Sequence, residues 1–185
     1  LFGTNPICFG VPTGKIPFIL DASTSIINRG KIRHANKLGE KIPYGVALDK
    51  SGKITINPKK ALQGTQLPIA GFKGSGLAWM VDILSGVLTG SSHGGKTKDP
   101  FDDFSGPQNV GHLFITIDPK VFVGKNFMKE IKRNINIVKR LPKAKGCSSI
   151  LYPGERKNSL YKKNLKKDIS IPQKILKEID ELNVI

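Results

Sequence analysis

The sequence predicts a mixed α/β fold, an inference that rests on three observations. Short apolar segments bounded by Pro and Gly, which are typical of strands, occupy the first twenty residues. Apolar residues at helical spacing mark a helix over residues 75–88, and further helical patterns follow toward the C-terminus. Strands that are mixed with helices and hairpins in this way are typical of α/β and α+β proteins.

The N-terminal segment is expected to form a hairpin that leads into a helix. Residues 7–11 form one candidate strand, and the apolar alternation over residues 16–20 predicts a second. A helix is expected over residues 25–38, with Gly39 as its stop signal. An Asp or Ser side chain near its start would cap this helix by accepting hydrogen bonds from free backbone N–H groups.

The helix over residues 75–88 has the strongest pattern in the chain. Trp79 and Ile83 widen its apolar stripe, so we expect burial over much of its circumference. The other expected elements are a strand at 54–56, a loop over 91–110, a strand at 112–117, a helix after Pro119 with a buried apolar side and a break near Gly124, a strand at 149–152 and a helix from Pro172.

Length and composition describe a folded chain of modest size. Its 185 residues suffice for one domain, or for one domain with an appendage, and 38% hydrophobic content argues against disorder. No apolar run approaches the ~20 residues of a membrane helix, and no secretory leader is visible. Cys8 and Cys147 fit no disulfide framework or zinc spacing, so we expect buried thiols in a cytoplasmic environment.

The net charge of +16 suggests a polyanionic partner, but the residue types argue against nucleic acid. The 30 basic residues comprise 25 Lys and only 5 Arg, whereas nucleic-acid surfaces rely heavily on the bidentate Arg side chain. The densest Lys cluster, residues 157–167, contains one aromatic residue, Tyr161. A solvated face explains the cluster better, and binding of a phosphate-rich ligand or of nucleic acid stays as the alternative.

Three segments could bind an anion or a sugar hydroxyl. Residues 21–25 follow a predicted strand and precede a predicted helix, where a carboxylate, hydroxyls and free N–H groups meet. Residues 71–76, with Lys73 among three glycines, precede the strongest helix but match neither GxGxxG nor the Walker motif. Residues 152–156 end a predicted strand in a Pro-Gly turn that carries Glu155 and Arg156. From the residues alone, a plain helix cap explains residues 21–25 better than a ligand site does. A packing turn explains residues 71–76 equally well, and a surface turn is the usual meaning of Pro-Gly at residues 152–156.

The histidines and the clustered aspartates show no spacing typical of a catalytic or metal site. None of His34, His93 and His112 has the neighbours of a nucleophilic triad or a metal site. The aspartates at 99, 102 and 103 cluster in one loop without a ligand of another type, so we predict no metal centre.

Several segments, taken in order, resemble the malate/L-lactate dehydrogenase family, which also holds ureidoglycolate dehydrogenase, diketogulonate reductase and sulfolactate dehydrogenase. The resemblance spans nearly the whole chain, and nine segments in register make it specific. The matching segments are Gly3-Thr4-Asn5-Pro6, Leu20-Asp21-Ala22-Ser23-Thr24-Ser25, Gly30-Lys31, residues 42–49, residues 61–64, Gly71-Phe72-Lys73-Gly74-Ser75-Gly76-Leu77-Ala78, residues 84–90, residues 109–115 and Pro153-Gly154-Glu155.

The resemblance implies NAD(P)-dependent interconversion of 2-hydroxy acids and 2-oxo acids, in homodimers or larger assemblies, on a sulfolactate dehydrogenase-like fold that is not a Rossmann fold. It implies that NAD or NADP contacts three segments of the chain. The implied cofactor-binding residues are Leu20, Asp21, Ala22, Ser23, Thr24, Ser25, Phe72, Lys73, Gly154, Glu155 and Arg156.

The chain departs from the family pattern in one decisive respect. The family's catalytic histidine and its substrate-binding arginine lie in an N-terminal portion that has no counterpart here. We therefore expect residues 1–185 to be the cofactor-contacting C-terminal portion of a dehydrogenase, with no catalytic residue of its own and no turnover alone. The alternative is a non-catalytic scaffold remnant that binds polyanions through its Lys-rich surface.

Overall fold

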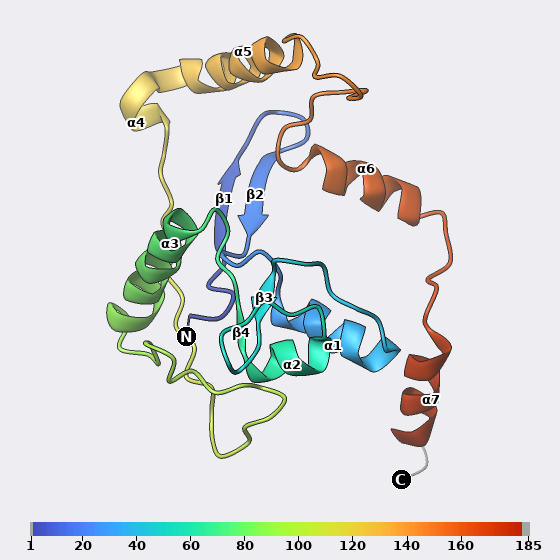
Figure 1. Cartoon of the computed structure of the whole chain (residues 1–185). Helices are drawn as coiled ribbons and strands as arrows, with labels where there is room; N and C mark the ends of the chain where they lie inside the picture. Colours follow the sequence, from blue (N-terminus) through green and yellow to red (C-terminus); the bar gives the residue numbers. More distant parts are fainter. Residues whose placement is uncertain (1, 183–185) are drawn as a thin grey trace. The chain divides into compact units, whose positions relative to one another are not determined.

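The computed structural model describes residues 2–182, which divide into two compact units (Figure 1). Unit 1 comprises residues 1–8 and 21–116, and unit 2 comprises residues 9–20 and 117–185, with residue 1 and residues 183–185 outside the description. The mixture of short strands and helices confirms the predicted mixed α/β class.

The predicted N-terminal hairpin is confirmed. Strand β1 (Ile7–Val11) has the predicted bounds, and it is paired with strand β2 (Phe18–Ala22) in a two-stranded sheet. Strand β2 begins and ends two residues later than predicted, so Asp21 lies inside it. The boundary between the two units crosses this hairpin.

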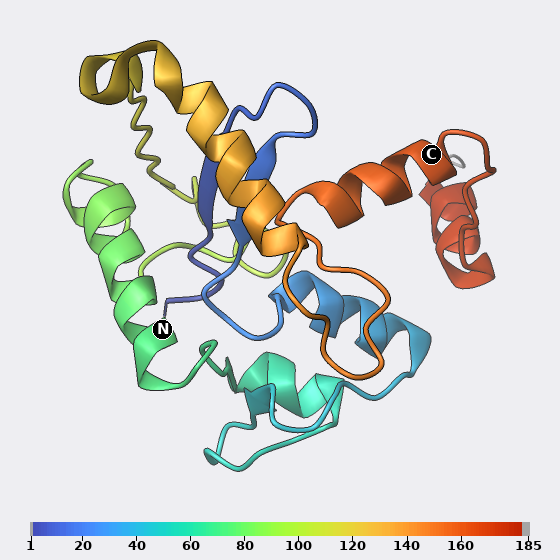
Figure 2. The same cartoon turned by 90° about the horizontal axis from the view of Figure 1, so that it is seen from above.

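The core of unit 1 lies around helix α1 (Arg29–Leu38) and helix α2 (Pro58–Gln63), which pack together. Strand β3 (Ala47–Leu48) pairs antiparallel with strand β4 (Thr65–Gln66) beside α2. Both views of the ribbon show α1 and α2 next to each other (Figures 1 and 2). The buried apolar side chains of this core are Ile27, Ile32, Ala35, Ile42, Val46, Ala47 and Ala61.

Helix α1 begins four residues later than predicted, because its N-cap is Asn28 rather than an Asp or Ser of residues 21–25. The Asn28 side chain accepts a hydrogen bond of 2.7 Å from the Lys31 N–H. Its oxygen satisfies a donor that the helix leaves unpaired. The predicted stop is confirmed, since Gly39 ends the helix in the left-handed conformation with a φ of 73°.

Helix α3 (Phe72–Asp82) confirms the strongest predicted helix and continues into a π-helical segment, η1 (Ile83–Val87). The predicted burial of its circumference is wrong for the described residues. Only Gly74, Ala78 and Gly86 are buried along α3 and η1, while Trp79 and Ile83 are about half exposed.

Unit 2 carries its helices in the C-terminal half of the chain. They are α4 (Lys120–Val123), the 3-10 turn η2 (Gly124–Asn126), α5 (Phe127–Lys139), α6 (Glu155–Asn164) and α7 (Gln173–Leu182). The predicted break is confirmed at Gly124, whose φ is 59°. The predicted burial of the apolar side of α4 and α5 is wrong, because these two helices contain no buried residue.

Three predicted strands are wrong, and helix α6 was not predicted. Residues 112–117 and 149–152 belong to no strand, and residues 54–56 contribute only an isolated bridge between Leu48 and Ile54. An apolar alternating segment becomes a strand only when a second chain segment accepts its backbone hydrogen bonds. These segments lack a full-length partner within the described residues.

Candidate functional site

Unit 1 brings the N-terminal turn against the segment that follows β2. The Thr24 N–H donates to the Thr4 carbonyl at 2.9 Å, and the Thr24 hydroxyl lies 3.1 Å from the carbonyl oxygens of both Thr4 and Asn5. Thr24 is only 1% exposed. The Asn5 side chain in turn donates to the Ala78 carbonyl of α3 at 3.0 Å. The turn therefore connects residues 24–25 with α3.

The same segment also lies beside the chain that leads into α3. The Ile69 N–H donates to the Thr24 carbonyl at 2.9 Å, and Ser25 forms an antiparallel bridge with Pro68. Gly71 and Lys73 follow directly along the chain. Two of the three predicted anion-binding segments are thus brought together within unit 1.

Residues 21–25 do not lie at a helix N-terminus, which corrects the sequence-based expectation. Asp21 and Ala22 lie in β2, and helix α1 begins at Arg29. The Ser23 and Ser25 hydroxyls each donate to a nearby backbone carbonyl at 2.8 Å. These hydroxyl protons hold the turn in shape, and Asp21, at the start of the segment, is exposed.

The start of α3 offers the clearest anion site in unit 1. Gly71 precedes the helix with a φ of 59°, and no side chain caps the helix, whereas Asn28 and Asn57 cap α1 and α2. The N–H groups of the first turn and the helix dipole both favour a negative charge. Lys73, exposed in this first turn, adds a cation.

The third predicted segment lies in unit 2, where Gly154 is tightly packed. Gly154 has a φ of 105°, and a Cβ atom there would lie 2.5 Å from the Pro17 carbonyl oxygen. The Ile19 N–H donates to the Pro153 carbonyl at 3.0 Å, and the Tyr152 hydroxyl donates to the Ile16 carbonyl at 2.7 Å. Only glycine fits this close approach of the turn to residues 16–19.

Glu155 is held by its own unit, and its ion-pair partner is Lys139. One carboxylate oxygen pairs with the Lys139 ammonium group, and the other accepts from the Tyr152 N–H at 3.2 Å. Glu155 is 9% exposed, whereas Arg156 is exposed. The Glu155 carboxylate therefore fixes the turn, and Arg156 is the side chain of this segment that is open to an anion.

A cavity of about 240 Å³ lies beside this turn within unit 2. Its walls combine apolar side chains of residues 16–19 with polar side chains of α6. The lining residues are Ile16, Pro17, Ile19, Gly154, Lys157, Asn158 and Tyr161.

Unit 1 contains a larger cavity of about 770 Å³, which is lined by both polar and apolar residues. Thr4, Asn5, Thr24 and Ser25 line it, together with α1 and the loop over residues 91–110. Within the described residues, no three His, Cys, Asp or Glu side chains gather as they would around a metal ion.

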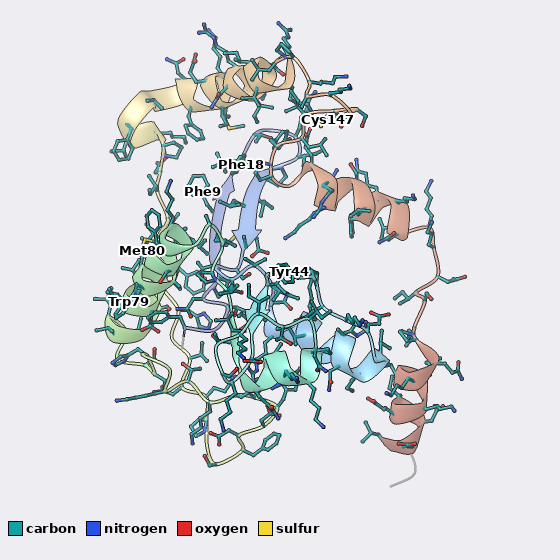
Figure 3. The ribbon with its side chains drawn as sticks, viewed as in Figure 1. Phe9, Phe18, Tyr44, Trp79, Met80 and Cys147 are labelled. Atoms are coloured by element: carbon teal, nitrogen blue, oxygen red, sulfur yellow. The ribbon has the colours of Figure 1, made fainter. Side chains whose placement is uncertain are left out.

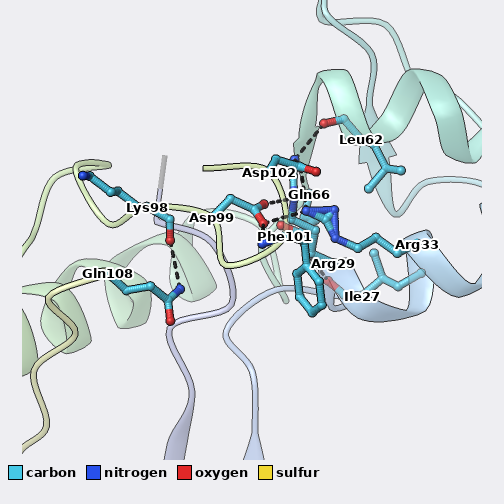
Figure 4. A network of polar contacts seen from close by, with 10 residues as sticks. All are labelled: Ile27, Arg29, Arg33, Leu62, Gln66, Lys98, Asp99, Phe101, Asp102 and Gln108. Atoms are coloured by element: carbon cyan, nitrogen blue, oxygen red, sulfur yellow. Dashed lines mark hydrogen bonds and ion pairs between the residues drawn. The ribbon is translucent and has the colours of Figure 1, made fainter. Parts of the chain in front are cut away.

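Two arginines of α1 bind the loop over residues 91–110, and both the arginines and the loop line this cavity (Figure 4). An Arg33 nitrogen lies 2.7 Å from both Asp99 and Asp102, and its guanidinium lies 4.8 Å from the centre of the Phe101 ring. Arg29 pairs with Asp99 at 3.0 Å and donates to the Leu62 carbonyl at 3.0 Å. Sequence reasoning found the aspartates but missed the arginines, because 66 residues separate Arg33 from Asp99.

The surroundings of Asp99 lower the pKa of its carboxyl group. Partial burial of the carboxylate raises this pKa and is the largest single effect. Hydrogen bonds from the Phe101 N–H and from Arg33, with the charges of both arginines, together outweigh it. The ionised carboxylate therefore stabilises the folded state above the ordinary pKa, and this contribution is lost as the pH falls through the lowered pKa.

We expect Asp99→Asn to lower the free energy of unfolding at pH 7 by on the order of 1 kcal/mol. The difference from the parent chain should begin to shrink as the pH falls below the ordinary Asp pKa of about 3.9, and it should disappear below the lowered pKa of Asp99 in the folded chain. Urea unfolding of both chains over a pH series from 7 down to about 2 measures the effect, with Asp168→Asn, at an exposed position, as control. A deficit of equal size at both ends of the pH series would contradict the ion-pair explanation.

Comparison with known proteins assigns the chain to a family. The sequence model of the malate/L-lactate dehydrogenase family matches residues 1–180. The malate/(S)-sulfolactate dehydrogenase of Methanothermus fervidus is 39% identical over all of this chain and 54% of its own length. The (2R)-3-sulfolactate dehydrogenase (NADP(+)) of Chromohalobacter salexigens is 33% identical over 97% of the chain and 52% of its own length.

Solved structures show the same relationship in three dimensions. Sulfolactate dehydrogenase from Methanocaldococcus jannaschii superposes with a TM-score of 0.78 at 36% identity, over 95% of this chain and 50% of that one. A dehydrogenase from Sinorhizobium meliloti gives a TM-score of 0.87 at 29% identity, over 96% of this chain and 51% of that one. The chain spans about half the length of the relatives that it matches. With its sequence and its fold in agreement, the chain belongs to the malate/L-lactate dehydrogenase family.

Proposed function

We propose that this chain is the dinucleotide-contacting C-terminal portion of an NAD(P)-dependent oxidoreductase that interconverts 2-hydroxy acids and 2-oxo acids. The observation that carries the proposal is the uncapped start of α3, where Lys73 follows a segment bonded to Thr24. This arrangement suits the pyrophosphate of a dinucleotide, because main-chain N–H groups, a helix dipole and a cation act on one anion. Two relatives are named as malate and sulfolactate dehydrogenases, which supports 2-hydroxy acids as the substrate class.

Each unit supplies its own groups in this proposal. In unit 1, the first turn of α3 binds phosphate oxygens, and the Asp21 carboxylate accepts a hydrogen bond from a ribose hydroxyl. In unit 2, the Gly154 turn and Arg156 are open to a second polar part of the dinucleotide. The proposed contacts are Leu20, Asp21, Ala22, Ser23, Thr24, Ser25, Phe72, Lys73, Gly154, Glu155 and Arg156.

When bound, the nicotinamide supplies hydride transfer to or from the 2-carbon of the substrate. The residues of this chain bind and orient, and none is assigned as the proton-transferring group. His93 is held against the Ser91 carbonyl at 3.0 Å, which suits a structural role. Because no residue here is assigned to proton transfer, we propose that the chain alone is inactive. From the family resemblance, we also propose that the whole enzyme is a cytoplasmic homodimer and that its fold is not a Rossmann fold.

Titration with NADH and with NADPH tests this proposal. We expect saturable enhancement of nicotinamide fluorescence, reversed by excess oxidised nucleotide, together with no turnover of malate, lactate or sulfolactate. Absence of binding up to millimolar nucleotide would contradict the cofactor role. Measurable turnover by the purified chain would contradict the assignment of catalysis to a portion outside these residues.

A second candidate function, polyanion binding, follows from the charge of unit 2. This unit holds 18 of the chain's 30 Lys and Arg residues but 7 of its 14 Asp and Glu residues. Affinity for a polyanion that falls steeply with salt, without any nicotinamide nucleotide binding, would favour this role.

A further inference from the structure

The Gly154 turn of unit 2 is followed by a nearly buried carboxylate whose cation lies on another helix. Glu155, 9% exposed, is the first residue of α6, and its carboxylate pairs with the ammonium group of Lys139, the last residue of α5. The same carboxylate accepts a hydrogen bond from the Tyr152 N–H at 3.2 Å. Because a buried carboxylate is costly without a cation beside it, the position of the Lys139 ammonium group determines where the start of α6 lies.

Lys139 also contacts the residue on the other side of this turn. Its ammonium nitrogen lies 5.5 Å from the centre of the Tyr152 ring, within the range of a cation–π interaction. The Tyr152 ring stacks on Phe18 of β2, which Figure 3 labels, with ring centres 6.4 Å apart. One ammonium group therefore touches both residues that flank the turn at 153–154.

Helix α5 also contacts the hairpin turn to which the Gly154 turn is bonded. A Cβ atom at Gly14 would lie 3.1 Å from the Lys132 Cε atom, so the helix passes close to the turn between β1 and β2. The Thr13 hydroxyl, 4% exposed, donates to the Ile16 carbonyl at 2.8 Å. The Tyr152 hydroxyl donates to the same oxygen at 2.7 Å, so both of its lone pairs are used. Helix α5 is thus in contact with both of the turns that meet at this carbonyl.

The groups that this network holds are those proposed to contact the dinucleotide in unit 2. Gly154 lines the cavity of about 240 Å³, and Arg156 is exposed next to Glu155. Lys139, sixteen residues before Glu155, belongs to none of the three predicted segments. A site that is held in its binding arrangement before the ligand arrives binds more tightly, because less conformational freedom is lost on binding.

We propose that Lys139 is a positioning residue for the dinucleotide. Acting through the Glu155 carboxylate, it holds the Gly154 turn and Arg156 in the arrangement that the cofactor binds. This inference rests on the proposed function and adds a residue that itself makes no contact with the nucleotide.

Fluorescence titration with NADPH tests the inference. We expect Lys139→Met to weaken binding by about tenfold, because the Glu155 carboxylate loses its cation. Lys139→Arg should bind within about threefold of the parent chain, since a guanidinium group can also pair with a carboxylate. The affinities are compared at a temperature at which urea unfolding shows every variant to be folded, so that a loss of stability does not by itself lower them. Unchanged affinity of Lys139→Met overturns the inference, as does equal weakening by the Met and Arg variants.

Lys129→Met is the matched control for net charge. Lys129 is exposed on the same helix, ten residues earlier and therefore about 15 Å away along the helix axis. Its substitution should change NADPH affinity by less than about twofold. Equal weakening by Lys129→Met and Lys139→Met would make overall charge the cause and overturn the positioning role.

A Glu155→Gln background distinguishes positioning from direct contact with the nucleotide. In that background, Lys139→Met should change NADPH affinity by less than about twofold, because the carboxylate through which Lys139 acts is gone. If Lys139→Met weakens binding equally in both backgrounds, Lys139 acts on the phosphate itself and the positioning role is wrong.

Hydrogen exchange measures the positioning without any nucleotide. The Ile19 N–H donates to the Pro153 carbonyl at 3.0 Å, so its exchange reports whether the turn stays in place. In Lys139→Met this amide should exchange at least about tenfold faster than in the parent chain, and in Lys129→Met at the parent rate. Unchanged exchange in Lys139→Met overturns the inference even if NADPH binds. Faster exchange in a chain whose parent binds no NADPH overturns the proposed function instead.

Discussion

Replacing Gly74 with Ala is expected to destabilise unit 1 by about 2–3 kcal/mol, since the added methyl group overpacks a buried position. Its Cβ atom would lie 1.9 Å from the Ile69 carbonyl oxygen and 2.8 Å from the Ile69 carbonyl carbon. Backbone atoms cannot move aside as the end of a flexible side chain does. The start of α3 would have to separate from the segment that hydrogen-bonds Thr24.

Gly76, two residues further along the same helix, is the matched control. Nothing lies within 4 Å of a Cβ atom built there, and its backbone is helical. Gly76→Ala should therefore stabilise the chain by about 0.5–1 kcal/mol, because alanine loses less backbone entropy in a helix. Urea unfolding of both variants measures the difference, and a shift in the same direction for both would contradict the packing described for α3.

Lys73→Gln is expected to weaken binding of NADPH by roughly ten- to a hundredfold, the range for loss of a charge-assisted hydrogen bond. The substitution removes the cation from the uncapped start of α3 and leaves the helix amides in place. Because Lys73 is exposed, the unfolding midpoint should not change. Fluorescence titration at fixed ionic strength gives the affinity.

Lys59→Gln provides the control for net charge. Lys59 also lies in the first turn of a helix, α2, but there the Asn57 side chain already caps the helix. We expect its effect on NADPH affinity to be less than twofold. If both variants weakened binding equally, the affinity would depend on overall charge, as in the polyanion alternative, and not on the start of α3.

Local sequence signals predicted those elements that are stabilised by contacts close along the chain. Strand β1, the end of α1 at Gly39, the break at Gly124 and the helix from residue 173 follow from short-range patterns and from glycine conformation. The sequence pattern places the start of α1 four residues too early, because several residues before it could act as caps. Only the fold selects Asn28, by pairing the segment before it with residues 67–69.

The candidate site divides in the same way. Motif resemblance named Lys73 and the Gly154 turn, but not how each residue is used. The structure turns the Thr24 and Ser25 hydroxyls toward backbone carbonyls, pairs Glu155 with Lys139, and leaves the start of α3 without a cap. The Arg33–Asp99 pair was invisible in the sequence, since no local pattern links residues so far apart.

The sequence by itself determined the family, the class of fold and the glycine-dependent turns, because each is encoded in residues that are neighbours along the chain. The tertiary structure alone decided which hydroxyls and charges are already satisfied, and which apolar segments lack a partner. Residues 112–117 illustrate the physical reason. Strand propensity resides in the segment, but a strand exists only where a second backbone supplies its hydrogen bonds.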